Sequence, residues 1–338
     1  MFKFKQLGVA AAIALTAVSA MATNFRAADQ VYLPIGGHAT GSSGTFQSDV
    51  VISNLSPDPV TVTVIFSSGA TGVQQPNLPS INLLANERKE FVDFFGTTLG
   101  LTANLGVVVF NACKTGTSCG ADTQDSSGFS PNFRNISVES RIYSGSNGTT
   151  GQLFSGYPWY NFVSSDQAAN GLDKVQIVGI RNTGSAGQAG TFRTNIGLVN
   201  ASQYSNTTLK VSLFAGNNPT TPLGTATQGL GPLGQIQTGL GALFPGVTGV
   251  GNLTNAFVTV EQIGSTPTSD APQTCLPNGC PGFFAYGSVL DNASGDATTL
   301  EAQYSKPLSD NQIACIYNPS NASCKNVQSI RRAAKHIF

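Results

Sequence analysis

A repeated segment constrains the fold of this chain more than any other sequence feature. The run GTFQSDVVISN at Gly44–Asn54 returns as GTFRTNIGLVN at Gly190–Asn200, an offset of 146 residues. This spacing is too long for a solenoid repeat and matches the size of a whole domain. Weaker similarities follow in the same order, with 31–36, 105–110 and 137–143 matching 175–180, 256–260 and 284–290. The sequence therefore predicts two similar domains that arose by duplication.

Both copies of the repeat alternate with a period of two residues, which is typical of a strand with one buried face. Phe46, Ser48, Val50 and Ile52 share a face in the first copy, and the second copy is expected to bury Phe192, Thr194, Ile196 and Leu198. Turn residues and a second alternating strand follow each copy, and no long stretch has a helical period. This pattern predicts an all-β fold of two tandem immunoglobulin-like antiparallel β-sandwich domains.

The first residues are typical of a secretory signal peptide. A basic start with Lys3 and Lys5 precedes an apolar run, and Ala20-Met21-Ala22 is a small-residue cleavage site. We expect a signal peptide over 1–22, a first domain over 30–145, a linker over 146–172, a second domain over 173–305 and a tail over 306–338. The apolar run is short for a membrane span, although a retained anchor is the alternative. The mature chain is therefore expected to lack an integral membrane segment and to be secreted, to the medium, the cell surface or the periplasm.

The charge balance excludes some classes of partner. Only 10% of the residues are charged, and removing Lys3 and Lys5 from 17 basic residues leaves 15 against 17 acidic ones. Such a surface has no electrostatic footprint for nucleic acid. The hydrophobic fraction of 40% is ample for packed cores.

Six cysteines fall into three close pairs, Cys113 with Cys119, Cys275 with Cys280, and Cys315 with Cys324. An even count in an exported chain favours disulfides over metal ligation, and local pairing within each loop is the preferred interpretation. The first two pairs lie in long connections, 111–135 and 262–282, at matching places in the two copies. Long loops on a rigid sandwich are common binding sites, but a disulfide can equally serve only to staple such a loop.

No catalytic constellation emerges from the sequence. Asp49 of the first copy is replaced by Asn195 in the second, so an acid–base role shared by both copies is not expected. His38 is the only histidine in the folded body, and its glycine-rich surroundings predict a solvated loop residue. We therefore predict no catalytic residue, no cofactor and no metal site.

Trp159, the only tryptophan, lies between the two copies and is the candidate ligand contact. An aromatic side chain here could stack on a sugar ring, or it could be a plug that fixes the two domains against each other, which is the preferred interpretation. The segment after Leu300 shows no counterpart in the first copy.

The repeat, with the Tyr32-Leu33-Pro34 segment that precedes its first copy, resembles a group of uncharacterised secreted bacterial proteins that carry one or more such β-domains. The resemblance spans about residues 31 to 305. It implies export and a β-sandwich, and it brings no catalytic residue to carry over.

These observations favour a non-enzymatic secreted or cell-surface protein with a structural, adhesive or assembly role. Its partners would be another copy of the chain, another surface protein or a glycan. The alternative is a carbohydrate- or ligand-binding module that uses the disulfide loops or Trp159. A third hypothesis is an unrecognised secreted hydrolase.

Overall fold

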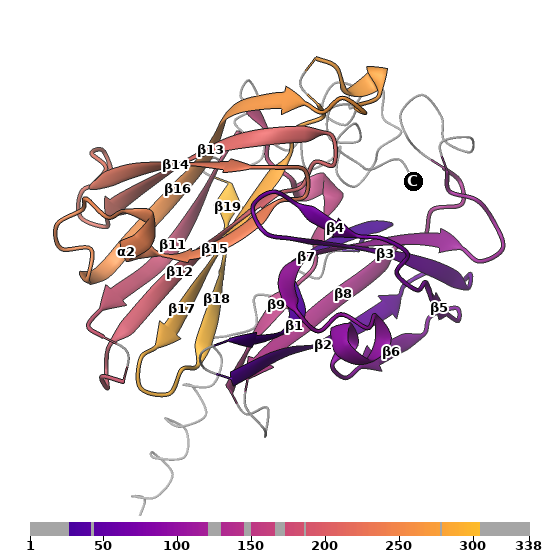
Figure 1. The fold of residues 1–338 in the computed structure, drawn as a ribbon, viewed down its shortest axis with the longest axis horizontal. Helices are drawn as coiled ribbons and strands as arrows, with labels where there is room; N and C mark the ends of the chain where they lie inside the picture. Colours follow the sequence, from indigo (N-terminus) through magenta and orange to yellow (C-terminus); the bar gives the residue numbers. More distant parts are fainter. Residues whose placement is uncertain are drawn as a thin grey trace, which may run out of the picture.

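The computed structural model describes residues 27–41, 44–120, 130–144, 150–165, 173–185, 187–277 and 279–304. Its strands form two antiparallel sheets, an arrangement consistent with β-sandwiches (Figure 1). We call β1 to β10 the first unit and β11 to β19 the second unit. The predicted signal peptide, the tail over 306–338 and its Cys315 and Cys324 lie outside the described residues.

The first unit contains ten strands, a π-helical turn η1 (Phe94–Thr98) and a 3-10 turn η3 (Trp159–Asn161). Its strands are β1 (Gln30–Gly41), β2 (Gly44–Asn54), β3 (Val60–Ser68), β4 (Val73–Gln75), β5 (Ile81–Leu83), β6 (Arg88–Phe91), β7 (Asn104–Lys114), β8 (Ile136–Ser144), β9 (Thr150–Ser155) and β10 (Tyr157–Pro158).

The second unit contains nine strands, the short helix α2 (Leu240–Leu243) and a 3-10 turn η5 (Gln273–Cys275). Its strands are β11 (Lys174–Thr183), β12 (Phe192–Asn200), β13 (Ser205–Ala215), β14 (Gly224–Leu230), β15 (Gln235–Gly239), β16 (Asn252–Pro267), β17 (Phe283–Asp291), β18 (Ala297–Glu301) and β19 (Gln303–Tyr304).

The two units share one strand order. The first runs β4-β3-β7-β1-β2-β8-β9 and the second β14-β13-β16-β11-β12-β17-β18. In the first unit β1 pairs with β2 only at the hairpin end, at Ala39–Gly41, and in the second unit only Thr183 pairs with Phe192. Each sheet therefore folds over at this hairpin, and its two layers enclose a core of their own.

The last residue of the repeated motif, an asparagine in both copies, has a structural role. Asn54 is buried, and its Nδ2 donates to the carbonyl oxygens of Asp58 and Leu84, both at 2.8 Å, while its Oδ1 accepts from the backbone N–H of Ser56 at 3.0 Å. Buried polar groups of a loop need partners of this kind.

Asn200 makes the same three bonds in the second unit. Its Nδ2 donates to the carbonyl oxygens of Ser205 and Gly231, both at 2.7 Å, and its Oδ1 accepts from the N–H of Ser202 at 3.0 Å. In both units the asparagine ties the end of one strand to the loop that follows and to a segment about 30 residues further on.

The hydroxyl residue in the middle of the motif, Ser48 or Thr194, also has a structural role. The hydroxyl of Ser48 donates to the carbonyl oxygen of Gly37 at 3.0 Å, and Thr194 donates in the same way to the carbonyl oxygen of Arg181. Both hydroxyls are buried and join the two layers where the hairpin opens.

The predicted alternation of buried and exposed residues is confirmed for most of the residues expected to face the core. Ser48, Val50 and Ile52 are buried in β2, as are Thr194, Ile196 and Leu198 in β12. The first residue of each set behaves differently, because Phe46 and Phe192 are only partly buried at the strand start.

The structure corrects one expectation about the C-terminal segment. β19 pairs with β11 at Val175↔Tyr304 and Gln176↔Gln303, just as β10 pairs with β1 at Val31↔Pro158 and Tyr32↔Tyr157. Gln303 and Tyr304, in the described part of the segment after Leu300, therefore have a counterpart in the first copy. The sequence hid it because only two residues take part, and they differ between the copies.

An aromatic cluster joins the two units, and we call it the interface cluster. Tyr157 stacks on Phe284 with ring centroids 4.7 Å apart, Phe162 stacks on the same ring, and Tyr32 meets Phe162 edge-on. Phe154 meets Tyr286 in the same way at 5.3 Å. Large buried rings dominate the energetics of such contacts, so the two units are held as one body.

A glycine turn of the first unit also docks on the second. The N–H of Gly231 donates to the carbonyl oxygen of Ala70 at 2.8 Å, and that of Gln235 donates to Gly69 at 2.9 Å. Gly72 has a φ of +72°, and a Cβ there would lie 1.7 Å from the carbonyl oxygen of Pro232. This contact requires glycine, because no side chain fits between the two backbones.

Candidate functional site

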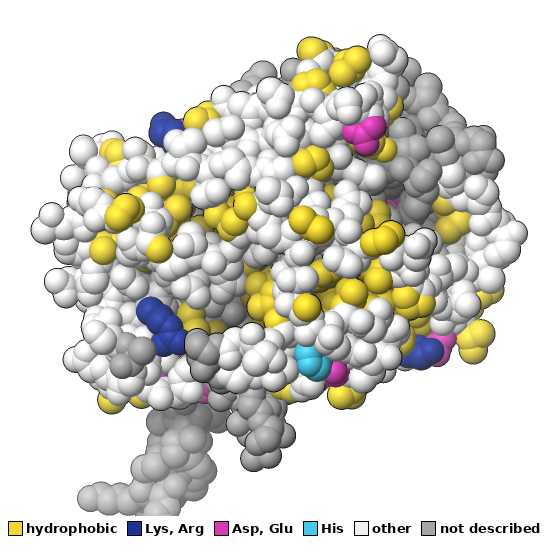
Figure 2. All heavy atoms as spheres, in the orientation of Figure 1, with side chains coloured by type: hydrophobic (Ala, Val, Ile, Leu, Met, Phe, Trp, Pro, Cys, Tyr) yellow, Lys and Arg dark blue, Asp and Glu magenta, His cyan; other side chains and the backbone are white. Residues whose placement is uncertain are grey.

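A cleft of about 450 Å³ opens where the interface cluster ends, and both units line it. Its volume falls within the range of about 300 to 1,000 Å³ that is usual for small-ligand sites. Figure 2 shows hydrophobic side chains exposed between the two units on this face of the molecule. The cleft is the candidate functional site because it is concave and combines apolar with convergent polar groups.

The second unit supplies the polar wall from the outer face of three neighbouring strands. Directly paired residues of antiparallel strands point to the same face. The outer face of β15, β12 and β17 therefore carries the rows Gln235–Val199–Phe284, Gln237–Gly197–Tyr286 and Gly239–Asn195–Ser288. Gly239 has no side chain to cover Asn195. The next residue along this face of β12 is Arg193, and both Asn195 and Arg193 line the cleft.

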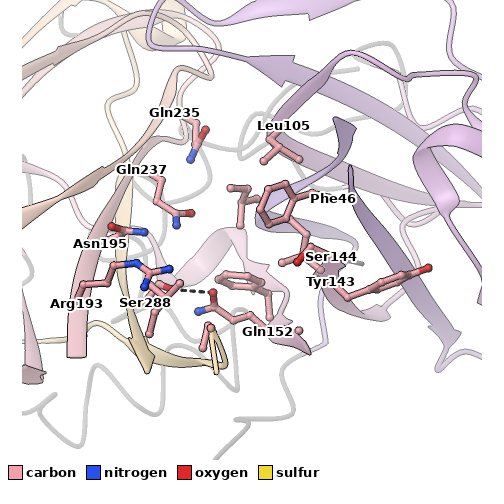
Figure 3. A pocket seen from close by; sticks show the side chains of 17 residues that line it. Phe46, Leu105, Tyr143, Ser144, Gln152, Arg193, Asn195, Gln235, Gln237 and Ser288 are labelled. Carbon is pink, nitrogen blue, oxygen red and sulfur yellow. Dashed lines mark hydrogen bonds between the residues drawn. The ribbon is translucent and has the colours of Figure 1, made fainter. Parts of the chain in front are cut away.

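The first unit supplies the apolar wall. Ile35, Phe46, Leu105, Ile142 and Phe154 line this side of the cleft. Figure 3 shows Phe46 and Leu105 across the cleft from the polar side chains of the second unit. An apolar face opposite a polar one suits a ligand that has both kinds of surface.

The floor of the cleft is fixed by hydrogen bonds between the units. Gln152 of β9 accepts from the hydroxyl of Ser288 at 2.8 Å (Figure 3). It also donates to the hydroxyl of Thr299 at 2.9 Å. Tyr286 donates to Oε1 of Gln237 at 3.0 Å, and burial raises the pKa of its hydroxyl far above the physiological range. These groups stay neutral and hold the walls in place before any ligand arrives.

The electrostatics of the cleft are one-sided. Among the described residues that line it, Arg193 is the only charged one, and none is an aspartate or a glutamate. The remaining polar groups are neutral amides and hydroxyls, which both donate and accept hydrogen bonds.

His38 corrects a second expectation. It lies on strand β1 and not in a solvated loop, with 20% of its side chain exposed. Its Nδ1 is 2.9 Å from both carboxylate oxygens of Asp93, and Gln47 donates to the same carboxylate at 3.3 Å. No local sequence pattern indicates this pair, because Asp93 is 55 residues away from His38.

A carboxylate that holds one nitrogen of a histidine is part of the catalytic triads of hydrolases, where a nucleophile bonds to the other nitrogen. Among the described residues, no serine, threonine or cysteine is hydrogen-bonded to His38. Asp93 instead begins the η1 turn in a left-handed conformation, and its N–H donates to Asp49 at 2.9 Å. Tyr143 donates to the same oxygen at 3.2 Å, and its pKa is raised by burial and by the charge of Asp49.

The described part of the chain contains no group of three histidine, cysteine or acidic side chains placed to hold a metal ion.

Trp159 lies outside the cleft, among packed side chains. It is partly buried and contacts both the core of the first unit and the interface cluster. Its indole Nε1 donates to Asp29 Oδ1 at 2.9 Å. This geometry favours the interpretation of Trp159 as a plug that fixes the two units.

Within the described residues two disulfides form, Cys113–Cys119 and Cys275–Cys280, with the predicted local pairing. The first joins Cys113 at the end of β7 to Cys119 in the β7–β8 connection, the second lies within the β16–β17 connection, and none of these cysteines lines the cleft. A ligand in the cleft would therefore not touch the disulfide loops.

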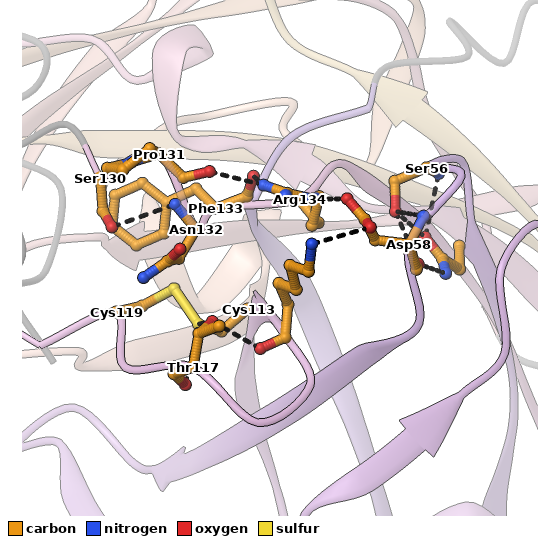
Figure 4. A network of polar contacts seen from close by, with 12 residues as sticks. Ser56, Asp58, Cys113, Thr117, Cys119, Ser130, Pro131, Asn132, Phe133 and Arg134 are labelled. Atoms are coloured by element: carbon orange, nitrogen blue, oxygen red, sulfur yellow. Dashed lines mark hydrogen bonds and ion pairs between the residues drawn. A yellow bond between two sulfur atoms is a disulfide. The ribbon is translucent and has the colours of Figure 1, made fainter.

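The first disulfide loop is held by charge as well as by sulfur. Asp58 accepts from Lys114 at 3.1 Å and from Arg134 at 2.8 Å, and these two hydrogen bonds lower the pKa of its carboxyl (Figure 4). Arg134 also donates to the carbonyl oxygens of Pro131 and Phe133, which anchors the returning chain.

Comparisons with known proteins add no relative: no protein-family model, curated protein or solved structure matches this chain. Within the described residues, no helix has the length and apolar character to cross a membrane. The resemblance to secreted bacterial β-domain proteins stays a prediction.

Proposed function

We propose that this protein is a non-enzymatic binding protein of an oxidising compartment, and that its cleft takes a hydroxyl-rich ligand, a glycan. The observation that carries the proposal is the cleft itself, with an amide-lined wall facing an apolar one across about 450 Å³. The two tandem units, which we propose to be variants of the immunoglobulin-like sandwich, would act as a rigid frame for this site.

The side chains of the cleft suit a sugar. Asparagine and glutamine offer both donors and acceptors, as sugar hydroxyls require. The ring of Phe46 offers a face against which the C–H side of a sugar ring can pack. The disulfides support an oxidising compartment, because such bonds persist outside the reducing cytosol.

The proposal is tested by screening oligosaccharides against the purified protein with saturation-transfer NMR, followed by calorimetry on each hit. Phe46→Ala should weaken binding roughly 10-fold, as expected when a stacking ring is lost. Because Phe46 is only partly buried, the variant should keep its fold, which circular dichroism would confirm.

The duplication provides a matched control for this variant. Phe192 occupies the same position in the second copy, stacks with Arg181 and does not line the cleft. Phe192→Ala should therefore leave binding unchanged. Absence of any glycan hit, or equal losses in both variants, would reject the cleft as a sugar site.

Assembly through a sheet edge is the second candidate function, and strand β14 favours it. β14 pairs with β13 alone in the described structure, and it contains neither a proline nor a charged residue to block its free edge. The same edge of the first unit is divided between two three-residue strands. Light scattering should show oligomers that Thr227→Lys removes, whereas a wild-type monomer at high concentration would rule out this assembly.

A further inference from the structure

We infer that the ligand of the cleft carries a carboxylate, and that uronic acid oligosaccharides are the class of glycan bound. The inference rests on the proposed function, which it makes more specific. It concerns Arg193 and Asn195, the two residues by which the second copy of the repeat differs in charge from the first at this face.

The guanidinium group of Arg193 has no counter-ion among the residues that the structure describes. Its Nη1 donates to the neutral amide oxygen of Asn292 at 2.9 Å, and the described residues offer it no ion pair. Figure 3 shows the group turned toward the cleft. A partly buried cation is stabilised by an anion, and the planar fork of arginine matches a carboxylate with two parallel hydrogen bonds.

The two copies of the repeat differ in charge at this face. Gln47 and Asp49 of the first copy become Arg193 and Asn195 in the second, so one position gains a positive charge and the other loses a negative one. In the first unit Gln47 and Asp49 are used internally, since both bond to Asp93.

In the second unit these two positions line the cleft instead. The side chain of Asn195 makes no hydrogen bond to another described residue, which leaves its amide available to a ligand. The second copy therefore places a cation and a free amide on the wall of the cleft, where the first copy has two side chains that bond within their own unit.

A sugar acid fits this wall better than a peptide strand does. Between Asn195 and Val199, strand β12 is paired on both sides, with β15 and with β17, so a peptide cannot add to the strand that carries Arg193 and Asn195. What it offers is side-chain amides for hydroxyls and one guanidinium for a carboxylate. We therefore assign the carboxylate to a sugar, and a peptide C-terminus becomes an outcome of the test.

Calorimetry with the purified protein tests this assignment. The probes are a galacturonic acid trisaccharide and its methyl ester, which keeps the hydroxyls and the shape but not the charge. The acid should bind at least 10-fold more tightly than the ester. Arg193→Gln should weaken binding of the acid roughly 10- to 100-fold, the range expected for a charge-assisted hydrogen bond, and leave the ester unaffected.

Arg181→Gln is the matched control, because Arg181 lies on the adjacent strand β11 and does not line the cleft. It should leave both affinities unchanged. Equal binding of acid and ester, with no effect of Arg193→Gln, would overturn the carboxylate inference and leave the glycan proposal standing. Binding of a short peptide with a free C-terminus that depends on Arg193 would overturn the sugar class, and no binding of any oligosaccharide would remove both proposals.

Discussion

Replacing Asn54 with alanine should destabilise the first unit by about 3 kcal/mol. The substitution removes three hydrogen bonds between a buried side chain and the backbone, to Asp58, Leu84 and Ser56. Each such bond contributes about 1 kcal/mol net, and the loss is larger where a buried backbone group stays unpaired. Asn200→Ala should cost about the same or slightly less, because its side chain makes the equivalent three backbone bonds but lacks the fourth bond that Asn54 accepts from the Ser56 hydroxyl at 2.9 Å.

Urea unfolding followed by tryptophan fluorescence measures this loss directly. Trp159 is the only tryptophan and packs on the core of the first unit and on the interface cluster, so its signal reports on both. The control is Asn82→Ala, at an exposed position where one hydroxyl bond is lost and less than about 0.5 kcal/mol is expected. Losses below about 1 kcal/mol in both buried variants would refute the structural role of the motif asparagine.

Asn54→Asp tests the burial of this site through the pH dependence of stability. A carboxylate at this site would face two carbonyl oxygens in place of donating to them, and it would be buried. Both effects raise its folded-state pKa above the unfolded value of about 3.9. Its destabilisation is therefore small below that pH and grows as pH rises toward the folded-state pKa. A stability difference from wild type that does not change between pH 3 and pH 7 would contradict the burial.

Three further variants test the frame around the site. Gly72→Ala should destabilise the contact between the units by roughly 2 kcal/mol or more, because its positive φ and the neighbouring backbone leave no space for a Cβ, and small-angle scattering should show a more extended particle. Replacing Cys113 and Cys119 with serine should cost roughly 2–3 kcal/mol in urea unfolding and leave ligand affinity unchanged, since their loop does not reach the cleft. The stabilisation from Asp58, whose pKa is lowered by its two hydrogen-bonded cations, is present above the ordinary carboxyl pKa and is lost as pH falls through the lowered value. Asp58→Asn should therefore reduce the acid dependence of unfolding, and an unchanged pH profile would contradict the ion pairs.

The parts of the fold that follow from local pattern could be predicted from the sequence. Alternation identified the buried faces of β2 and β12, because a strand that covers a core must place every second residue inward. Local cysteine pairing was also predictable, because closing a loop of six residues has a small entropy cost.

The site could not be predicted in the same way, because it lies between segments that no local pattern connects. The hydrogen bond between Gln152 and Ser288 joins residues 136 positions apart, and the pair of His38 and Asp93 spans 55. The cleft depends on how the two sheets dock, and docking is decided by the interface cluster and by close contacts such as the one at Gly72. The single available signal was the pair of charge differences between the two copies.

Those differences show how a duplicated chain separates folding from binding. Residues that the copies share, such as Asn54 and Asn200, make the same bonds in both units and therefore maintain the fold. The double variant Arg193→Gln with Asn195→Asp restores the first copy's residues in the second unit. Both side chains line the cleft, and the one hydrogen bond removed is that from Arg193 to the buried Asn292, so the unfolding free energy should fall by no more than about 3 kcal/mol, while uronate binding is lost. A variant that unfolds would show that these positions maintain the fold after all. A variant that still binds uronate would show that these two differences between the copies do not create the binding site.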